Sequence, residues 1–177
     1  MRAETLRSMV MSAVMGAFGI TLPIVFHMVG LGSKFLPMLL PILLNGFLSL
    51  LPWAALTGAL VPVASGLLTG MPPFYPPIAL VMSIEGTLMA AAAAVIYRLS
   101  KPRIWPALVV AVVLGRAVSA TLMWFIAGRF GLPPAVISAA SLIQGFPGVA
   151  LQLVVVPLVV RGIRARKGIL LPDNDKS

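Results

Sequence analysis

The sequence predicts an all-α integral membrane protein with six transmembrane helices and both termini in the cytoplasm. Its 177 residues are 60% hydrophobic and only 10% charged, whereas a soluble domain averages about 25% charged residues. Long apolar runs alternate with short segments that are basic or rich in proline and glycine. The basic residues lie at the ends of these runs and mostly on one side of the membrane, which is the pattern of a topology signal.

We expect one membrane domain over residues 1–177, with a polar tail at 168–177. The first apolar run has a basic start, like a signal peptide, but it is long, contains Pro23 and has no clear cleavage site. It is therefore interpreted as a transmembrane helix. The six predicted helices cover about 8–26, 36–50, 54–68, 76–97, 105–127 and 135–160.

The first three runs carry residues that shape helix packing. Pro37 and Pro41 predict a bent or broken start of the second run, and Pro52 with Trp53 predicts a tight turn before the third. Small residues at three- and four-residue spacing let another helix approach closely, although such spacing also arises by chance in an Ala- and Gly-rich chain. They are Ala13, Gly16, Ala17 and Ile20 on the first run, and Gly58, Pro62 and Gly66 on the third.

The distribution of basic residues predicts the orientation. With six spans, ten basic residues fall on the side of the termini and two on the other side. The positive-inside rule then places both termini in the cytoplasm and the loops at 27–35, 70–76 and 128–134 outside. The ten are Arg2, Arg7, Arg98, Lys101, Arg103, Arg161, Arg164, Arg166, Lys167 and Lys176, and the two are Lys34 and Arg129.

Two opposite charges inside long apolar runs mark a candidate polar site. Glu85 lies in the fourth run and Arg116 near the middle of the fifth. An intramembrane charge costs about 2.5–3.5 kcal/mol on insertion scales and usually faces protein or a water-filled cavity. The two are predicted to bind ligand or to pair, with a purely structural ion pair as the alternative. Asn45, Ser83, Gln144 and Gln152 add uncharged donors and acceptors, each also suited to an interhelical hydrogen bond.

Other function classes lack their signatures. There is no cysteine, and His27 is the only histidine, so a usual metal site is not expected. No G-x-S-x-G, HEXXH or Walker A motif is present, so we expect neither an enzyme nor an ATPase, and no cofactor. The basic residues form no single amphipathic face, which argues against nucleic-acid binding. No filter motif of a channel is visible.

The sequence resembles the substrate-binding S component of energy-coupling factor (ECF) vitamin transporters. The resemblance spans nearly the whole chain and is mostly architectural: small size, six spans and cytoplasmic termini. Its motifs are Ala13-Val-Met-Gly-Ala17 on the first run and the series FLPMLLPILL, NG and LTGMPP over residues 35–73.

This resemblance implies a binding subunit in a prokaryotic plasma membrane that captures a vitamin or cofactor precursor from outside. It implies docking on a transmembrane coupling subunit that two ATPases drive, with Ala13 and Ala17 at the docking face. The pocket would lie between the loops His27–Lys34 and Met71–Tyr75 and helices four to six. Within this pocket, the charge and depth of the two residues, rather than a family motif, suggest that Arg116 holds a carboxylate or phosphate and Glu85 an amine or ring N–H. Nickel and cobalt members carry a Met-His start, whereas this chain has Arg2.

Two other functions remain open at this stage. One is a non-transporting scaffold subunit of an envelope assembly, and the other is a small secondary carrier that works as a homodimer. Co-purification with a coupling subunit and ATPases distinguishes an S component from a scaffold. Transport by the protein alone in liposomes would identify a carrier.

Overall fold

The computed structural model describes the chain except residues 1–2, 76, 101–102, 130–133 and 166–177. The predicted polar tail at 168–177 lies outside the described residues, as do the side chains of 33–34, 134–142, 144 and 164–165. All regular structure in the described part is helical. The helices are α1 (Ala3–Met28), α2 (Gly32–Phe35), α3 (Leu39–Leu48), α4 (Leu51–Thr69), α5 (Ile78–Leu99), α6 (Ile104–Arg129) and α7 (Pro134–Ala165).

The predicted all-α membrane fold is confirmed. Five helices in the described part of the chain are long and apolar enough to cross a membrane, namely α1, α4, α5, α6 and, over Gly145–Ile163, α7. The helix α3 is apolar but has only ten residues, about 15 Å at 1.5 Å per residue. The length of α3 is therefore about half the thickness of a bilayer core.

The second predicted run, 36–50, is interrupted where its prolines suggested. The four-residue α2 ends at Phe35, the residue after it, Leu36, has a left-handed φ of 46°, and α3 begins only at Leu39. The tight turn expected at Pro52 and Trp53 was wrong. The chain instead extends at Ser49 and Leu50, and Pro52 sits in the first turn of α4, where a missing backbone N–H leaves no hydrogen bond unmade.

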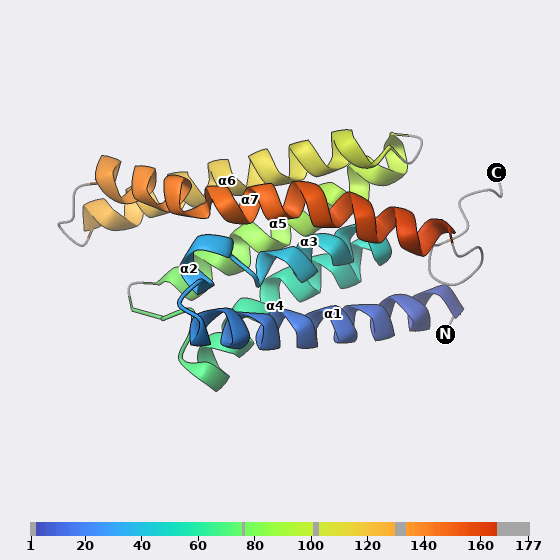
Figure 1. The fold of residues 1–177 in the computed structure, drawn as a ribbon, viewed down its shortest axis with the longest axis horizontal. Helices are drawn as coiled ribbons and strands as arrows, with labels where there is room; N and C mark the ends of the chain where they lie inside the picture. The colour runs from blue at the N-terminus through green and yellow to red at the C-terminus, as the bar shows by residue number, and fades with distance from the viewer. Residues whose placement is uncertain (1–2, 76, 101–102, 130–133, 166–177) are drawn as a thin grey trace.

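The short helix α3 forms the centre of the bundle. It packs against α1, α4, α5 and α7, and Figure 1 shows it in the middle of the molecule, between α1 on one side and α7 on the other. Nine of its ten residues are buried. Apolar side chains of α5, α6 and α7 complete this core, among them Met89, Leu108 and Val156. A helix that is apolar all round is stable in such a position because every face meets protein.

Small residues bring α4 and α5 into close contact. Gly58 of α4 faces Gly86 of α5, and a Cβ added at Gly58 would lie 2.5 Å from the carbonyl group of Gly86. Gly66 is packed as tightly at the far end of α4, against Pro72 and Phe74. The small face predicted from Gly58, Pro62 and Gly66 is thus a buried packing surface, as expected where backbones approach closely in a membrane.

Polar side chains attach α1 to α3 and α4. The Asn45 amide nitrogen donates to Ser12 Oγ and Thr57 Oγ1, both at 2.9 Å. Its carbonyl oxygen accepts a hydrogen bond from Ser49 Oγ at 2.6 Å. The Ser8 hydroxyl accepts the backbone N–H of Leu50 at 3.1 Å, at the break between α3 and α4. The polar groups of α1, α3, α4 and the break between α3 and α4 therefore find their hydrogen-bond partners in one another.

The two ends of the bundle differ. The start of α1 and the end of α7 lie at the same end, on the right in Figure 1. At this end Arg98 donates to the Ser49 carbonyl, which the helix break leaves without a helical partner. The short helix α2 and the loop that joins α4 to α5 lie toward the opposite end.

Candidate functional site

A cavity of about 310 Å³ lies toward the end of the bundle that carries α2. The parts of the chain that surround it are the last turns of α1, the segment from α2 to the start of α3, the loop after α4, the first half of α5 and the second half of α6. The lining residues are Pro23, His27, Gly32, Leu36, Pro37, Met38, Met71, Pro72, Pro73, Ile78, Val81, Met82, Glu85, Arg116, Ser119 and Met123.

The two intramembrane charges meet in this cavity as an ion pair. Glu85 Oε1 of α5 contacts the guanidinium of Arg116 on α6. The Glu85 side chain is 2% exposed, whereas that of Arg116 is 14% exposed. Arg116 is thus the more accessible member of the pair, with its Nη2 atom buried beside Glu85.

Helical spacing brings the remaining lining residues of α5 and α6 to the same cavity. Val81 and Met82 precede Glu85 by four and three residues, so they share its face of the helix. Ser119 and Met123 follow Arg116 by three and seven residues, about one and two helical turns, so they share its face of α6. The Ser119 hydroxyl makes no hydrogen bond to another residue of the described chain, so it is available to a ligand.

Apart from His27, the rest of the lining is apolar and contains no Phe, Tyr or Trp among the described residues. Methionine thioethers and proline rings make up half of the lining residues. Methionine is flexible and polarisable and packs well against aromatic rings. The lining therefore suits a flat apolar or heterocyclic body whose polar group meets Arg116. The residues are Met38, Met71, Met82 and Met123, with Pro23, Pro37, Pro72 and Pro73.

His27 lies at the cavity as an exposed side chain. Its Nδ1 is 2.8 Å from the Pro23 carbonyl one turn earlier, so Nδ1 carries the proton in that contact and Nε2 is left for other partners. Gly32 packs directly against the imidazole, and no side chain fits between them. The ring is thereby held between the last turn of α1 and the start of α2.

Four other candidate residues are not among the lining residues that the structure describes. Asn45 is fully buried and hydrogen bonded to Ser12, Ser49 and Thr57. Gln152 is 2% exposed within the bundle, and its Oε1 has no partner in the described part of the chain. The side chain of Gln144 lies outside the described residues, although its backbone belongs to α7.

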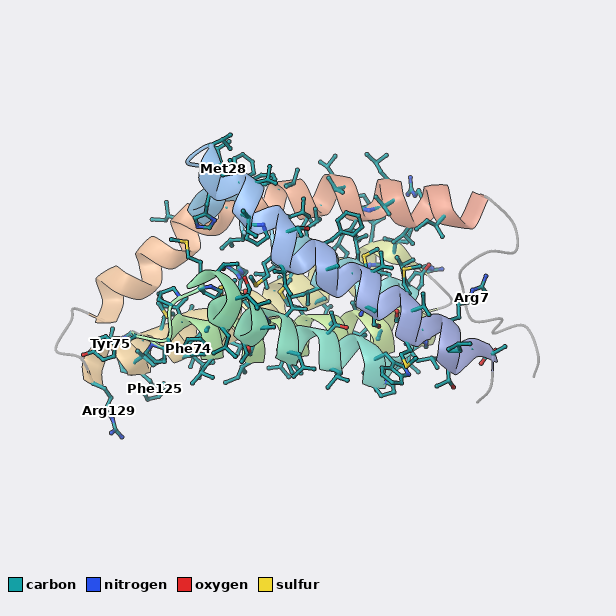
Figure 2. The ribbon with its side chains drawn as sticks, turned by 90° about the horizontal axis from the view of Figure 1, so that it is seen from below. Arg7, Met28, Phe74, Tyr75, Phe125 and Arg129 are labelled. Carbon is teal, nitrogen blue, oxygen red and sulfur yellow. The ribbon has the colours of Figure 1, made fainter. Side chains whose placement is uncertain are left out.

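Tyr75 is the fourth of these residues. It is 79% exposed, and Figure 2 places it with Phe74, Phe125 and Arg129 at one end of the molecule, opposite Arg7. The loop expected to form part of the pocket contributes Met71, Pro72 and Pro73 instead.

Sequence reasoning missed several lining residues. Ser119 and Met123 were detectable in principle, because they share the face of Arg116, and Met82 shares that of Glu85. Pro23 and the segment Leu36–Met38 carried no such signal, since their position depends on how α1 and the break after α2 fold over the cavity.

The residues expected at a docking face lie on the outside of α1. Ala13 and Ala17 are exposed, whereas Ser12 and Gly19 are buried against the bundle. Gly16 also turns inward, because a Cβ added there would lie 3.5 Å from Val61 of α4. The four small positions predicted on one face are therefore divided between the bundle and the exterior.

Comparison with known proteins gives a family but no individual relative. Residues 7–160 match the family described as ECF transporter, substrate-specific component. No curated protein and no solved structure matches the chain. The match covers most of the sequence and all the helices that surround the cavity. This chain therefore belongs to the ECF transporter substrate-specific components, which are multi-pass membrane subunits that bind a substrate for transport rather than enzymes.

Proposed function

We propose that this protein captures a vitamin or cofactor precursor at the outer face of a prokaryotic plasma membrane and delivers it to an ECF coupling subunit driven by two ATPases. The observation that carries the proposal is the cavity, which holds the Glu85–Arg116 ion pair. Its lining includes α2 and the loop after α4, which lie toward the end of the bundle opposite the termini (Figure 1). With the termini in the cytoplasm, as the basic residues predict, this end of the bundle faces the outside.

The depth of the ion pair supports a binding role. Glu85 lies about 10 Å from the start of α5 at 1.5 Å per residue, and apolar side chains surround it. Buried ion pairs are poor sources of stability, and intramembrane charges usually serve a substrate pathway. A pair that also lines a cavity is in the position expected of a substrate contact. His27 lies at the same cavity and is included in the proposed site.

The exposed face of α1 supports docking on a coupling subunit. Ala13 and Ala17 are one helical turn apart and both face outward. Small side chains at this spacing permit close approach of a second transmembrane helix. Family membership favours this partner over the scaffold assembly and the homodimeric carrier. A scaffold, moreover, would not require the cavity.

The experiment is mass spectrometry of small molecules extracted from the purified wild-type protein and from Arg116→Ala. The wild type should yield one bound molecule in a stoichiometric amount. Arg116→Ala should lack it, because truncation leaves the Glu85 carboxylate buried and unpaired and lowers the affinity by at least about 100-fold. Arg129→Ala is the matched control, since it removes an exposed arginine from the end of the same helix. It should retain the molecule. Folded wild-type protein without any bound molecule would refute the proposed function.

A further inference from the structure

We propose that the ligand presents an uncharged acceptor group, such as a carbonyl or a ring nitrogen, to Arg116, and that Glu85 is the counter-ion that makes the cavity reject anions. This inference rests on the proposed function and specifies the chemical class of its ligand. It differs from the carboxylate or phosphate that the charge and depth of Arg116 in the sequence suggested.

The charges of the cavity sum to zero. Glu85 and Arg116 are the only acidic, lysine or arginine residues among the lining residues that the structure describes, and they contact each other. His27 lies at the cavity near the last turn of α1, with Nδ1 on a backbone carbonyl. A ligand that carries a net charge to the ion pair would therefore add an uncompensated charge in a site surrounded by methionine and proline.

The groups that a ligand meets are hydrogen-bond donors. Arg116 is the more exposed member of the pair, and a guanidinium has five N–H groups, of which a carboxylate engages two at most. The Nη2 atom, which contacts Glu85, is buried, so the N–H groups of Nη1 and Nε are the ones that remain. The Ser119 hydroxyl, one turn along the same face of α6, adds another donor. A neutral acceptor can bind these groups without separating Arg116 from Glu85.

An ion of either sign is at a disadvantage in this arrangement. An anion on Arg116 would lie beside the buried Glu85 carboxylate, and like charges repel strongly where water is scarce. A cation would meet the guanidinium before it could reach Glu85, which is 2% exposed. Removal of one member of the pair should open the cavity to ions whose charge is opposite to that of the member that remains.

The test uses three planar probes of nearly equal shape: benzamide (neutral), benzoate (anionic) and benzamidine (cationic). Binding is measured by ligand-dependent thermal unfolding of the protein in nanodiscs of uncharged lipid. The wild type should bind benzamide at least about tenfold more tightly than either ion, a difference of about 1.4 kcal/mol. Glu85→Gln should reverse the order in favour of benzoate, and Arg116→Gln in favour of benzamidine.

Two further proteins make the outcome interpretable. Glu4→Gln removes an exposed carboxylate of α1 and should retain the wild-type order. The double variant Glu85→Gln, Arg116→Gln leaves no unpaired charge, so it tests the proposal if a single variant does not fold. It should distinguish the three probes less than tenfold.

The inference is overturned if the wild type prefers benzoate, if Glu85→Gln keeps the wild-type order, if the double variant still discriminates as the wild type does, or if no probe binds. An extracted natural ligand with a carboxylate or phosphate on Arg116 would also overturn it. That last result would leave the proposed function intact, because a ligand would still have been captured. The two proposals therefore fail on different observations.

Discussion

Gly145 of α7 lies directly against the guanidinium of Arg116 on α6. A Cβ added at Gly145 would be 3.0 Å from Arg116 Nη1 and 2.9 Å from Leu36 Cδ1. The absence of a side chain at this position therefore gives the guanidinium room between Glu85 on one side and α7 on the other. Through this contact α7, which contributes no lining residue among those described, helps to set the shape of the cavity.

We expect Gly145→Ala to weaken ligand binding by about tenfold, because the added methyl group displaces Arg116 or Leu36, and such overpacking typically costs about 1–3 kcal/mol. The measurement is the affinity for the extracted ligand. Gly162→Ala, on the same helix, is the control because nothing lies within 4 Å of its added Cβ. Equal affinity in both variants would show that the Gly145 contact does not position Arg116.

The contact between α4 and α5 predicts a contrast between two glycines. Gly58→Ala should lower the free energy of unfolding by at least about 1–3 kcal/mol, because its Cβ meets the backbone of Gly86 at 2.5 Å and backbone cannot move aside. Gly16→Ala should change it much less, since its Cβ reaches ordinary contact with Val61. Chemical unfolding in detergent micelles measures both, and equal losses would contradict the close helix contact.

The polar cluster around Asn45 predicts a change in stability rather than in binding. Asn45→Leu leaves Ser12, Ser49 and Thr57 without their amide partner, and we expect a loss of about 1–3 kcal/mol of unfolding free energy. Ligand affinity in the folded variant should stay within about threefold of wild type, a difference below 1 kcal/mol. A folded variant that no longer bound ligand would instead make Asn45 part of the site.

The outer face of α1 predicts a defect in assembly alone. Ala13→Leu or Ala17→Leu should prevent co-purification with the coupling subunit and ATPases, because the larger side chain holds the partner helix away. Ligand binding should be unchanged, since neither residue lines the cavity. Ala150→Leu places the same side chain on an exposed position of α7 and serves as the control. Full assembly of the α1 variants would argue against this docking face.

Composition and periodicity were sufficient to predict the helical membrane fold. Apolar runs long enough to span a bilayer must satisfy their backbone groups internally, so they become helices. The break near Pro37 was also predictable, because proline removes a backbone donor. The break at Ser49 and Leu50 was not, since it depends on tertiary partners: the Ser8 hydroxyl and the Arg98 guanidinium, which lie far away in the sequence.

The candidate site was predictable only where charge carried the signal. Glu85 and Arg116 were identifiable because an intramembrane charge needs a partner, and the structure brings them together. The side-chain amides gave no comparable signal for residues that line the cavity. Asn45 and Gln152 are equally polar in the sequence, yet the helix faces that bear them turn toward other helices rather than the cavity. Which face of a helix meets a cavity depends on rotation and crossing angle, and these follow from packing.

The contact between Glu85 and Arg116 also has an electrical consequence. One elementary charge that crosses a membrane at 100 mV gains or loses about 2.3 kcal/mol. Because the two charges are adjacent, they travel together in any reorientation of the bundle, and their contributions to this work cancel. An uncharged ligand adds nothing to the sum. Delivery of the ligand across the bilayer should then be insensitive, at this site, to the voltage of the cell.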